Sequence, residues 1–343
     1  MTMLTSFEGL HSRIQQRVGR IPTLEEVDFH EDWGHDKMQF VESMVSSGVL
    51  ACPAYWQSPD SRVCVGLWHF TGKDLAPADP IQATTLLTLA DDVTGELSLR
   101  MFNSTAKEIH MGLTASLEIA QTAVLPVARR LYFEAAIVEV LERKVVVECP
   151  IWDGETGVHL VTVKSTYAFI PLTSFMQRSK KTRNTSPPPT PHTSAPLPHG
   201  LPEDDLQSLD RAMSFLPLGR LEHKAGAVDE QAQSLVLVLD FGVRLSGPPL
   251  YVHGGIISTV LANASQLLFA RSTGLGARVV ASSTRRVRFL RGLPGESKDT
   301  VIEARVKSAD RSQVVIEAQL LRQGVAYTTL TTTYALAPIP SKL

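Results

Sequence analysis

The sequence predicts an α+β fold built from two copies of one unit, and three observations support this prediction. The second half contains a long apolar helix that opens with His253-Gly254-Gly255 and is followed by four segments typical of strands. The first half repeats this order of elements, and a proline-rich stretch separates the halves. Because a helix with a wide apolar face must pack on another layer, each unit is expected to be a curved antiparallel sheet around one long helix.

The helix of the second half has a broad apolar stripe whose spacing fits the helical period. The stripe consists of Ile256, Ile257, Val260, Leu261, Ala264, Leu267 and Leu268. The two glycines let another group approach the backbone closely, and bare amides at a helix start favour a carbonyl or an anion. Strands are expected at residues 235–243, 278–290, 300–308, 313–322 and 324–335.

Residues 82–91 of the first half align with residues 253–262 but lack the glycines. Strands are expected around this helix at residues 63–70, 113–125, 129–142, 144–152 and 158–170, with a hairpin turn at 153–157. The duplicated unit has roughly 130 residues, close to the usual size of one domain. We therefore divide the chain into a helical and polar lead segment (1–45), a first domain (46–173), a proline-rich linker (174–205), a second domain (206–337) and a tail (338–343).

The composition of the 343 residues, 43% hydrophobic and 20% charged, is that of an ordinary globular protein with two cores. A net charge of -2 argues against a nucleic-acid partner. No apolar run is long enough to cross a bilayer, and no secretory signal pattern is present. The three cysteines, Cys52, Cys64 and Cys149, lack the spacing of a metal site and are expected to be buried thiols. The segment at residues 28–36 contains side chains that could bind a metal, but it is interpreted as a solvated loop. No metal site is therefore expected.

The tripeptide Ser341-Lys342-Leu343 matches the type 1 peroxisomal import signal. We therefore expect a peroxisomal protein with the import receptor as a partner. The alternatives are a mitochondrial and a cytosolic location. A mitochondrial location is considered because residues 4–20 contain apolar and arginine positions that suit an amphipathic presequence. The same residues also suit a helix that packs on the first domain.

The His253-Gly254-Gly255 helix start and the strands that follow it resemble the acyl-CoA thioesterases with a hotdog fold, of the phenylacetate-pathway type. The resemblance implies two hotdog domains that form a pseudo-dimer within one chain, with further pairing of such pseudo-dimers left open. It also implies an acyl-CoA substrate, with coenzyme A as part of that substrate and no separate cofactor. In this family the glycine after the histidine presents its amide to the thioester carbonyl, and an acid nine positions after the histidine is the nucleophile or general base.

The resemblance implies an unequal distribution of these groups between the two copies. The second copy has His253 and Gly254 but carries Ala262 at the acid position, whereas the first copy carries Asp91 there. Because the acid and the amide of one site come from opposite subunits in this family, Asp91 and Gly254 are expected to form one composite site, with His253 beside them and Gly255 in substrate binding. The alternative is that neither site is active and that Asp91 is a carboxylate on the helix surface.

Four further residues are candidates for substrate binding. Ser282 lies where the family often places a hydroxyl group, and Ser116 is its counterpart and the better partner for Asp91. Arg286 and Arg288 share one face of a predicted strand and would suit the phosphates of coenzyme A. Alternatively, the two serines are ordinary hydroxyl groups of strands with no role in binding. The alternative for the two arginines is a solvated strand face that does not contact a substrate.

Thioester hydrolysis of an acyl-CoA is therefore the expected reaction, and a specialised biosynthetic role is left open. One rival is a hotdog hydratase or dehydratase acting on enoyl-CoA or hydroxyacyl-CoA. Its signature needs an aspartate and a histidine just before the helix, and here Asp74 and Asp79 have no histidine between them. The other rival is a non-catalytic acyl-CoA-binding protein, which the missing acid at Ala262 favours.

Overall fold

The computed structural model describes residues 25–27, 50, 54–70, 83–122, 130–174, 201–205, 209, 221–231, 233–242, 245–247, 251–272 and 280–337. The predictions for the basic amphipathic segment, the polar cluster at 28–36, Cys52, most of the linker and the Ser341-Lys342-Leu343 tripeptide lie outside these residues. Within the described part, no helix has the length and apolar character needed to span a membrane.

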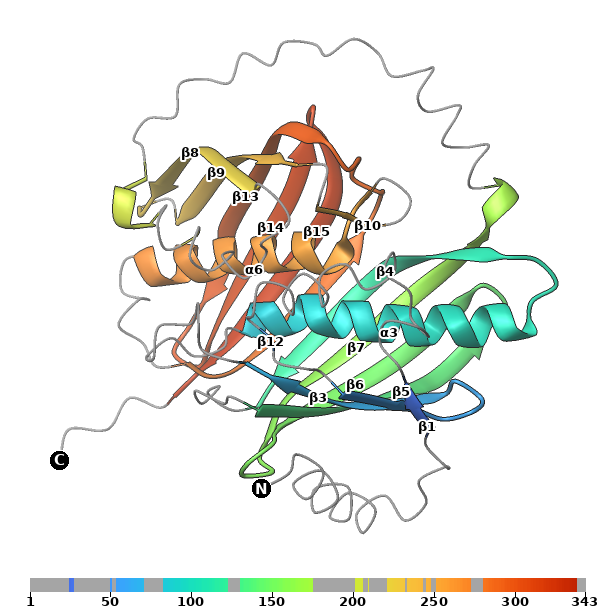
Figure 1. Cartoon of the computed structure of the whole chain (residues 1–343). Helices are drawn as coiled ribbons and strands as arrows, with labels where there is room; N and C mark the ends of the chain where they lie inside the picture. Colours follow the sequence, from blue (N-terminus) through green and yellow to red (C-terminus); the bar gives the residue numbers. More distant parts are fainter. Residues whose placement is uncertain are drawn as a thin grey trace.

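Each half of the chain folds as strands around one long helix (Figure 1). The elements of the first half are β1 (Glu25–Val27), β2 (Ala54–Gln57), β3 (Val63–His69), α3 (Ala83–Thr105), β4 (His110–Gln121), β5 (Arg130–Leu141), β6 (Lys144–Asp153) and β7 (His159–Pro171). Those of the second half are β8 (Leu221–Asp229), β9 (Ser234–Phe241), β10 (Ser246–Gly247), β11 (Tyr251–Val252), α6 (Gly254–Arg271), β12 (Val280–Phe289), β13 (Ser297–Ala309), β14 (Gln313–Arg322) and β15 (Val325–Leu336).

The two halves share one continuous antiparallel sheet. The strand order is β1-β2-β3-β5-β6-β7-β4-β12-β15-β14-β13-β9-β8, so the order of the first half is mirrored in the second. The halves join where β4 pairs with β12, with Gln121 opposite Ser283 and Ser116 opposite Arg288. This arrangement is the predicted duplication, and the join fixes how the two halves face each other.

The helices α3 and α6 lie side by side, each on the concave face of its own half of the sheet (Figure 1). At their contact the hydroxyl oxygens of Thr88 and Thr259 lie 3.0 Å apart. These two threonines are 171 residues apart, the same offset that aligns Gln82 with His253. Equivalent residues of the two copies therefore meet each other, which places the pseudo-two-fold axis of the duplication at this pair.

The core of the first half is aromatic. The rings of Trp68 and Phe133 stack with their centres 4.3 Å apart, and both side chains are fully buried. Cys64 and Cys149 are buried free thiols, as expected. Burial raises the pKa of both thiols, so they pack as apolar groups.

The described residues include five strands that the sequence pattern does not predict, namely β1, β2, β8, β10 and β11. β1 lies within the lead segment, yet it pairs with β2 and extends the sheet of the first half. Among the described strands, β8 lies at the edge of the second half, where β9 is its neighbour. Its sequence, LEHKAGAVD, contains a run of three charged or polar residues after Leu221 and lacks a regular alternation, which a strand at the edge of a sheet tolerates.

Candidate active site

Asp91 is the best-supported acid of the site. It lies on α3, and only 2% of its surface is exposed, so it is not a surface carboxylate. Oδ2 accepts a hydrogen bond of 2.7 Å from the backbone N–H of Gly255. Oδ1 accepts hydrogen bonds from the hydroxyl groups of Tyr167, at 2.9 Å, and Thr114, at 3.2 Å. A buried carboxylate is tolerated only when such donors replace water.

Tyr167 reaches Asp91 from β7, and Thr114 reaches it from the facing position on β4. Burial, together with the nearby charge of Asp91, raises the pKa of the Tyr167 hydroxyl well above its usual value. The hydroxyl therefore keeps its proton and acts as a donor to the carboxylate. Both oxygens of Asp91 are thus held in fixed positions by groups from α6, β4 and β7.

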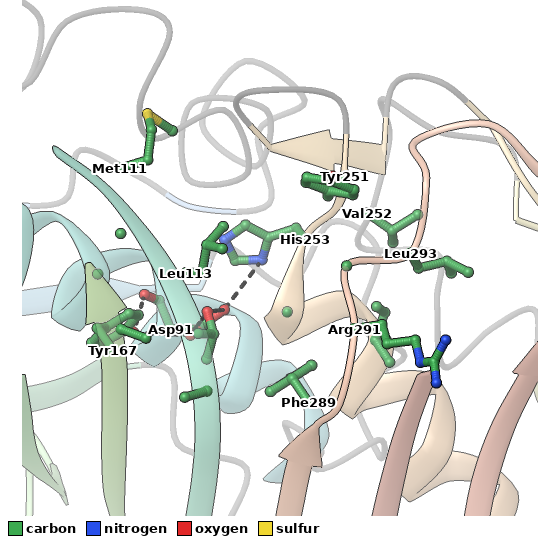
Figure 2. A pocket seen from close by; sticks show the side chains of 18 of the residues that line it. Asp91, Met111, Leu113, Tyr167, Tyr251, Val252, His253, Phe289, Arg291 and Leu293 are labelled. Atoms are coloured by element: carbon green, nitrogen blue, oxygen red, sulfur yellow. Dashed lines mark hydrogen bonds and ion pairs between the residues drawn. The ribbon is translucent and has the colours of Figure 1, made fainter. Parts of the chain in front are cut away.

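His253 links the second half to the carboxylates of α3. It is the N-cap residue of α6, with φ -60° and ψ 137°. Its Nε2 lies 2.8 Å from Oδ1 of Asp92, and its Nδ1 lies 3.5 Å from Oδ2 of Asp91. Figure 2 shows the His253 ring reaching from the start of α6 toward Asp91.

Two opposing effects set the protonation of His253. Burial lowers the pKa of the imidazole, but the charge and hydrogen bond of Asp92, together with the charge of Asp91, outweigh burial and raise the pKa to about 9. At neutral pH the ring is therefore an imidazolium with a proton on each nitrogen. A protonated Nδ1 cannot accept the Gly255 N–H, although it lies 3.2 Å away, so that N–H belongs to Asp91.

The two glycines at the start of α6 have different roles in this geometry. A Cβ on Gly255 would lie 2.6 Å from the Cα of Thr88, so only glycine lets the helices approach this closely. A Cβ on Gly254 would lie 3.0 Å from Oδ2 of Asp91 and from Oγ1 of Thr114. Within the described residues, the Gly254 N–H has no acceptor. It is a bare donor at the positive end of a helix dipole, beside a carboxylate.

A pocket of about 330 Å³ lies between the two halves at this point (Figure 2). Asp91, His253 and Gly254 line it together with Thr114 and Tyr167. Most of the other lining side chains are apolar, namely Leu99, Met111, Leu113, Val252, Ile257, Phe289, Leu290 and Leu293. An apolar pocket with a few converging polar groups is the usual form of a small-molecule site.

The structure brings together four of the residues selected from the sequence and separates the other four. Asp91, His253, Gly254 and Gly255 meet at the helix contact. None of the remaining candidates, Ser116, Ser282, Arg286 and Arg288, is among the residues that line the pocket.

The separated candidates have other neighbours. Ser116 pairs across the sheet with Arg288, and Arg286 contacts Glu118 at 3.2 Å on an exposed face. The hydroxyl beside Asp91 belongs to Thr114 instead of Ser116, because a bulge between these two residues changes which of them faces α3.

The equivalent position in the second copy has no acid, as the sequence indicates. Ala262 is completely buried, and the residue after it is Asn263 where the first copy has Asp92. Of the two equivalent helix positions, only that of the first half therefore supplies a carboxylate beside the glycine amides of α6. Among the described residues, no group of three or more His, Cys, Asp or Glu side chains is arranged to hold a metal ion.

Comparison with known proteins identifies the architecture. No protein-family model and no curated protein sequence matches the chain. The acyl-CoA thioesterase II TesB2 of Mycobacterium marinum aligns in structure with a TM-score of 0.50 and 12% identity, over 88% of this chain and 99% of its own. The protein has a double hotdog fold.

Two other solved structures give similar alignments. The tesB protein of Mycobacterium avium subspecies paratuberculosis has a TM-score of 0.49 at 11% identity, covering 88% of this chain and 100% of its own. The 12:0-ACP thioesterase of Umbellularia californica has a TM-score of 0.49 at 9% identity, covering 80% of this chain and 94% of its own. At such identities the match concerns the double hotdog fold, and the chemistry has to be argued from the site.

Proposed function

We propose that this protein hydrolyses the thioester bond of an acyl-CoA, at one composite site in each chain. The observation that carries the proposal is that the Asp91 carboxylate of the first half and the bare Gly254 N–H of the second half face one pocket. A thioester carbonyl needs a donor for its oxygen and a base or nucleophile at its carbon, and this pair of groups provides both.

In the proposed reaction Asp91 is a general base. Its Oδ1 accepts hydrogen bonds from Tyr167 and Thr114. Its Oδ2 accepts the Gly255 N–H at 2.7 Å and otherwise only a long contact of 3.4 Å from the Thr114 hydroxyl, whose shorter bond goes to Oδ1, so Oδ2 keeps a lone pair for water. Asp91 takes a proton from that water while the oxygen of the water bonds to the carbonyl carbon. The Gly254 N–H stabilises the negative oxygen of the tetrahedral intermediate. The C–S bond then breaks, the proton passes to the sulfur, and the products are a carboxylic acid and coenzyme A.

His253 and Asp92 position these groups. The imidazolium lies between the carboxylates of Asp91 and Asp92 and offsets their mutual repulsion. As the N-cap of α6, His253 also fixes the residue whose N–H is proposed to bind the carbonyl oxygen. Asp92 therefore acts through His253 and does not itself need to contact the substrate.

The walls of the pocket suit an acyl chain. Leu99 and Met111 line it from the first half, and Phe289 and Leu293 line it from the second. Arg291 also lines the pocket and is exposed, so it is better placed than Arg286 or Arg288 for the phosphates of coenzyme A. Acyl-CoA is therefore proposed as the substrate class.

Incubation of the purified protein with a panel of acyl-CoAs of different chain length tests the activity. The proposal predicts release of free thiol, measured with a thiol reagent, for at least one member of the panel. Binding of acyl-CoA without thiol release would contradict hydrolysis and favour a binding protein. Addition of water to an enoyl-CoA, seen as loss of the enoyl absorbance, would favour a hydratase.

We also propose a peroxisomal location for this activity. The Ser341-Lys342-Leu343 tripeptide supports it, because at the carboxyl end of a protein this sequence is read by the import receptor. A fluorescent protein fused before Met1 should give peroxisomal puncta that become diffuse when Leu343 is deleted. Puncta that persist without Leu343, or a mitochondrial pattern, would contradict the proposal.

A further inference from the structure

The equivalent site of the second half contains a buried arginine. This residue is Arg285, and the sheet registers show which residue of the first half is equivalent to it. In the first half, Tyr167 on β7 is opposite Thr114, and two positions earlier Ser165 is opposite Leu117. In the second half, Tyr334 on β15 is opposite Ser283, and two positions earlier Thr332 is opposite Arg285. Arg285 therefore occupies the core position that Leu117 has in the first half, and only 4% of its surface is exposed.

The charge of Arg285 is not balanced within the described residues. Its guanidinium donates one long hydrogen bond, 3.4 Å, to Oε1 of Gln121, and its Nε has no partner. None of the ion pairs in the described part of the chain includes it. A buried cation without a counter-charge is strongly unfavourable, so a negative group bound beside Arg285 would stabilise the folded protein.

Two buried hydroxyl groups beside Arg285 have no acceptor for their protons in the described part of the chain. They are Oη of Tyr334 and Oγ1 of Thr332, which lies opposite Arg285 across the sheet. Burial raises the pKa of Tyr334, while the charge of Arg285 and a side-chain hydrogen bond from its guanidinium lower the pKa. The hydroxyl oxygen therefore faces Arg285, and the hydroxyl proton still has no acceptor among the described residues. Unpaired buried donors of this kind are rare in native proteins.

Comparison of the two halves shows which group is missing. In the first half, the Tyr167 hydroxyl donates to the carboxylate of Asp91. In the second half, the residue equivalent to Asp91 is Ala262, so the equivalent Tyr334 has no carboxylate to donate to. Alanine is smaller than aspartate by one carboxyl group. The unbalanced cation and the unpaired hydroxyl therefore both point to a negative group of about the size of a carboxylate.

We propose that the second half-site binds a small monovalent anion in the place that the Asp91 carboxylate takes in the first half. Arg285 supplies the charge, and the hydroxyl groups of Tyr334 and Thr332 supply further donors. The planar guanidinium matches a carboxylate such as formate or acetate, and chloride has the same charge in a smaller volume. The inference is independent of the proposed hydrolysis, since none of these three residues lines the composite pocket.

Thermal unfolding of the full chain tests the proposal. The protein is kept in sodium gluconate, whose anion is too bulky for a buried site, and gluconate is replaced by formate, acetate or chloride at constant ionic strength. Binding to the folded state alone should raise Tm by about 2–5 °C near saturation. A response to the carboxylates alone identifies a carboxylate site, and a response to chloride alone identifies a halide site. A Tm that is the same in all four salts overturns the proposal.

Three variants separate anion binding from a purely structural role. Arg285→Leu installs the residue of the equivalent position, and it should be at least as stable as the wild type in gluconate and lose the anion response. Ala262→Asp supplies the carboxylate covalently, so it should also lose the response, with a raised Tm in gluconate. Arg286→Leu, at the exposed neighbouring position, should keep the response. An unchanged anion response in Arg285→Leu would overturn the proposal.

Direct binding gives a second readout if a variant folds poorly. The wild-type protein should broaden the NMR signal of chloride, or of isotopically labelled formate, and Arg285→Gln should abolish the effect. Gln keeps amide donors and part of the side-chain length but removes the charge. Equal broadening by both proteins, or none by the wild type, would contradict the assignment of Arg285 as the anion-binding residue.

Discussion

The backbone N–H of Gly255 lies 2.7 Å from the Asp91 carboxylate, although 164 residues separate them in the chain. This hydrogen bond joins the start of the second copy's helix to the acid of the first copy. The same start of α6 carries the bare N–H of Gly254, so the acid and the amide are held in one fixed arrangement. The site therefore requires both halves, and a change in the packing of α3 on α6 would displace both groups.

Gly254→Pro should lower kcat by roughly a hundredfold, because it removes the N–H proposed to bind the carbonyl oxygen. Proline is well tolerated at the first position of a helix, so α6 should still form. The matched control is Ala83→Pro, at the first residue of α3, which should leave turnover unchanged. Thiol-release kinetics on one substrate compare the two, and equal activity in both variants would argue against a role for this amide.

Gly255→Ala should lower the free energy of unfolding more than Gly254→Ala does. The new methyl group would lie 2.6 Å from the Cα of Thr88, and backbone cannot move aside as a side chain can. Overpacking of this kind typically costs about 1–3 kcal/mol, which denaturant unfolding can measure. Gly254→Ala is the control, since its methyl group would meet side-chain oxygens at 3.0 Å. The explanation fails if the two variants are equally stable.

The protonation of His253 should make stability depend on pH above neutrality. The pKa of His253 is about 9 in the folded protein, and an unfolded histidine has a pKa of about 6.5. Because the folded pKa is the higher one, the stabilisation is fully present below about pH 6.5 and is lost as the pH rises through about 9. NMR titration of the ring should give the raised value, and unfolding free energies at pH 6 and pH 9.5 should differ in the same direction.

Asp92→Asn tests the cause of that shift, because it removes the charge that raises the pKa of His253 while keeping a side chain of the same size. The pKa of His253 should fall, and the loss of stability between pH 6 and pH 9.5 should shrink. Glu118→Gln, on an exposed strand position, should change neither quantity. A wild-type His253 that titrates near 6.5 would contradict the interpretation.

The fold could be predicted from the sequence, and so could Asp91 and the His253-Gly254-Gly255 start of α6, because all of these depend on local patterns. The sequence predicts a strand at residues 144–152, and β6 spans Lys144–Asp153. Asp91 was found by placing the first copy under His253, which needs only the offset of the duplication.

The rest of the site depends on how strands and helices meet. Thr114 and Tyr167 reach Asp91 through the register of β4 on β7, and a bulge after Thr114 decides which hydroxyl faces inward. The sequence pattern contains no signal for that bulge, so it predicts Ser116 as the hydroxyl beside Asp91 instead of Thr114. The use of the Gly255 N–H by Asp91, like the unpaired charge of Arg285, appears only when the two halves are docked.

Thiol release by Asp91→Asn is the most direct test of the composite site. The variant keeps the shape of the side chain but loses the base, so kcat on a confirmed acyl-CoA substrate should fall about a hundredfold or more, with Tm showing that the chain is folded. Ala262→Gly, at the equivalent position of the second copy, should keep near-wild-type turnover. Near-wild-type turnover by Asp91→Asn would show that the acid lies elsewhere and would contradict the composite site.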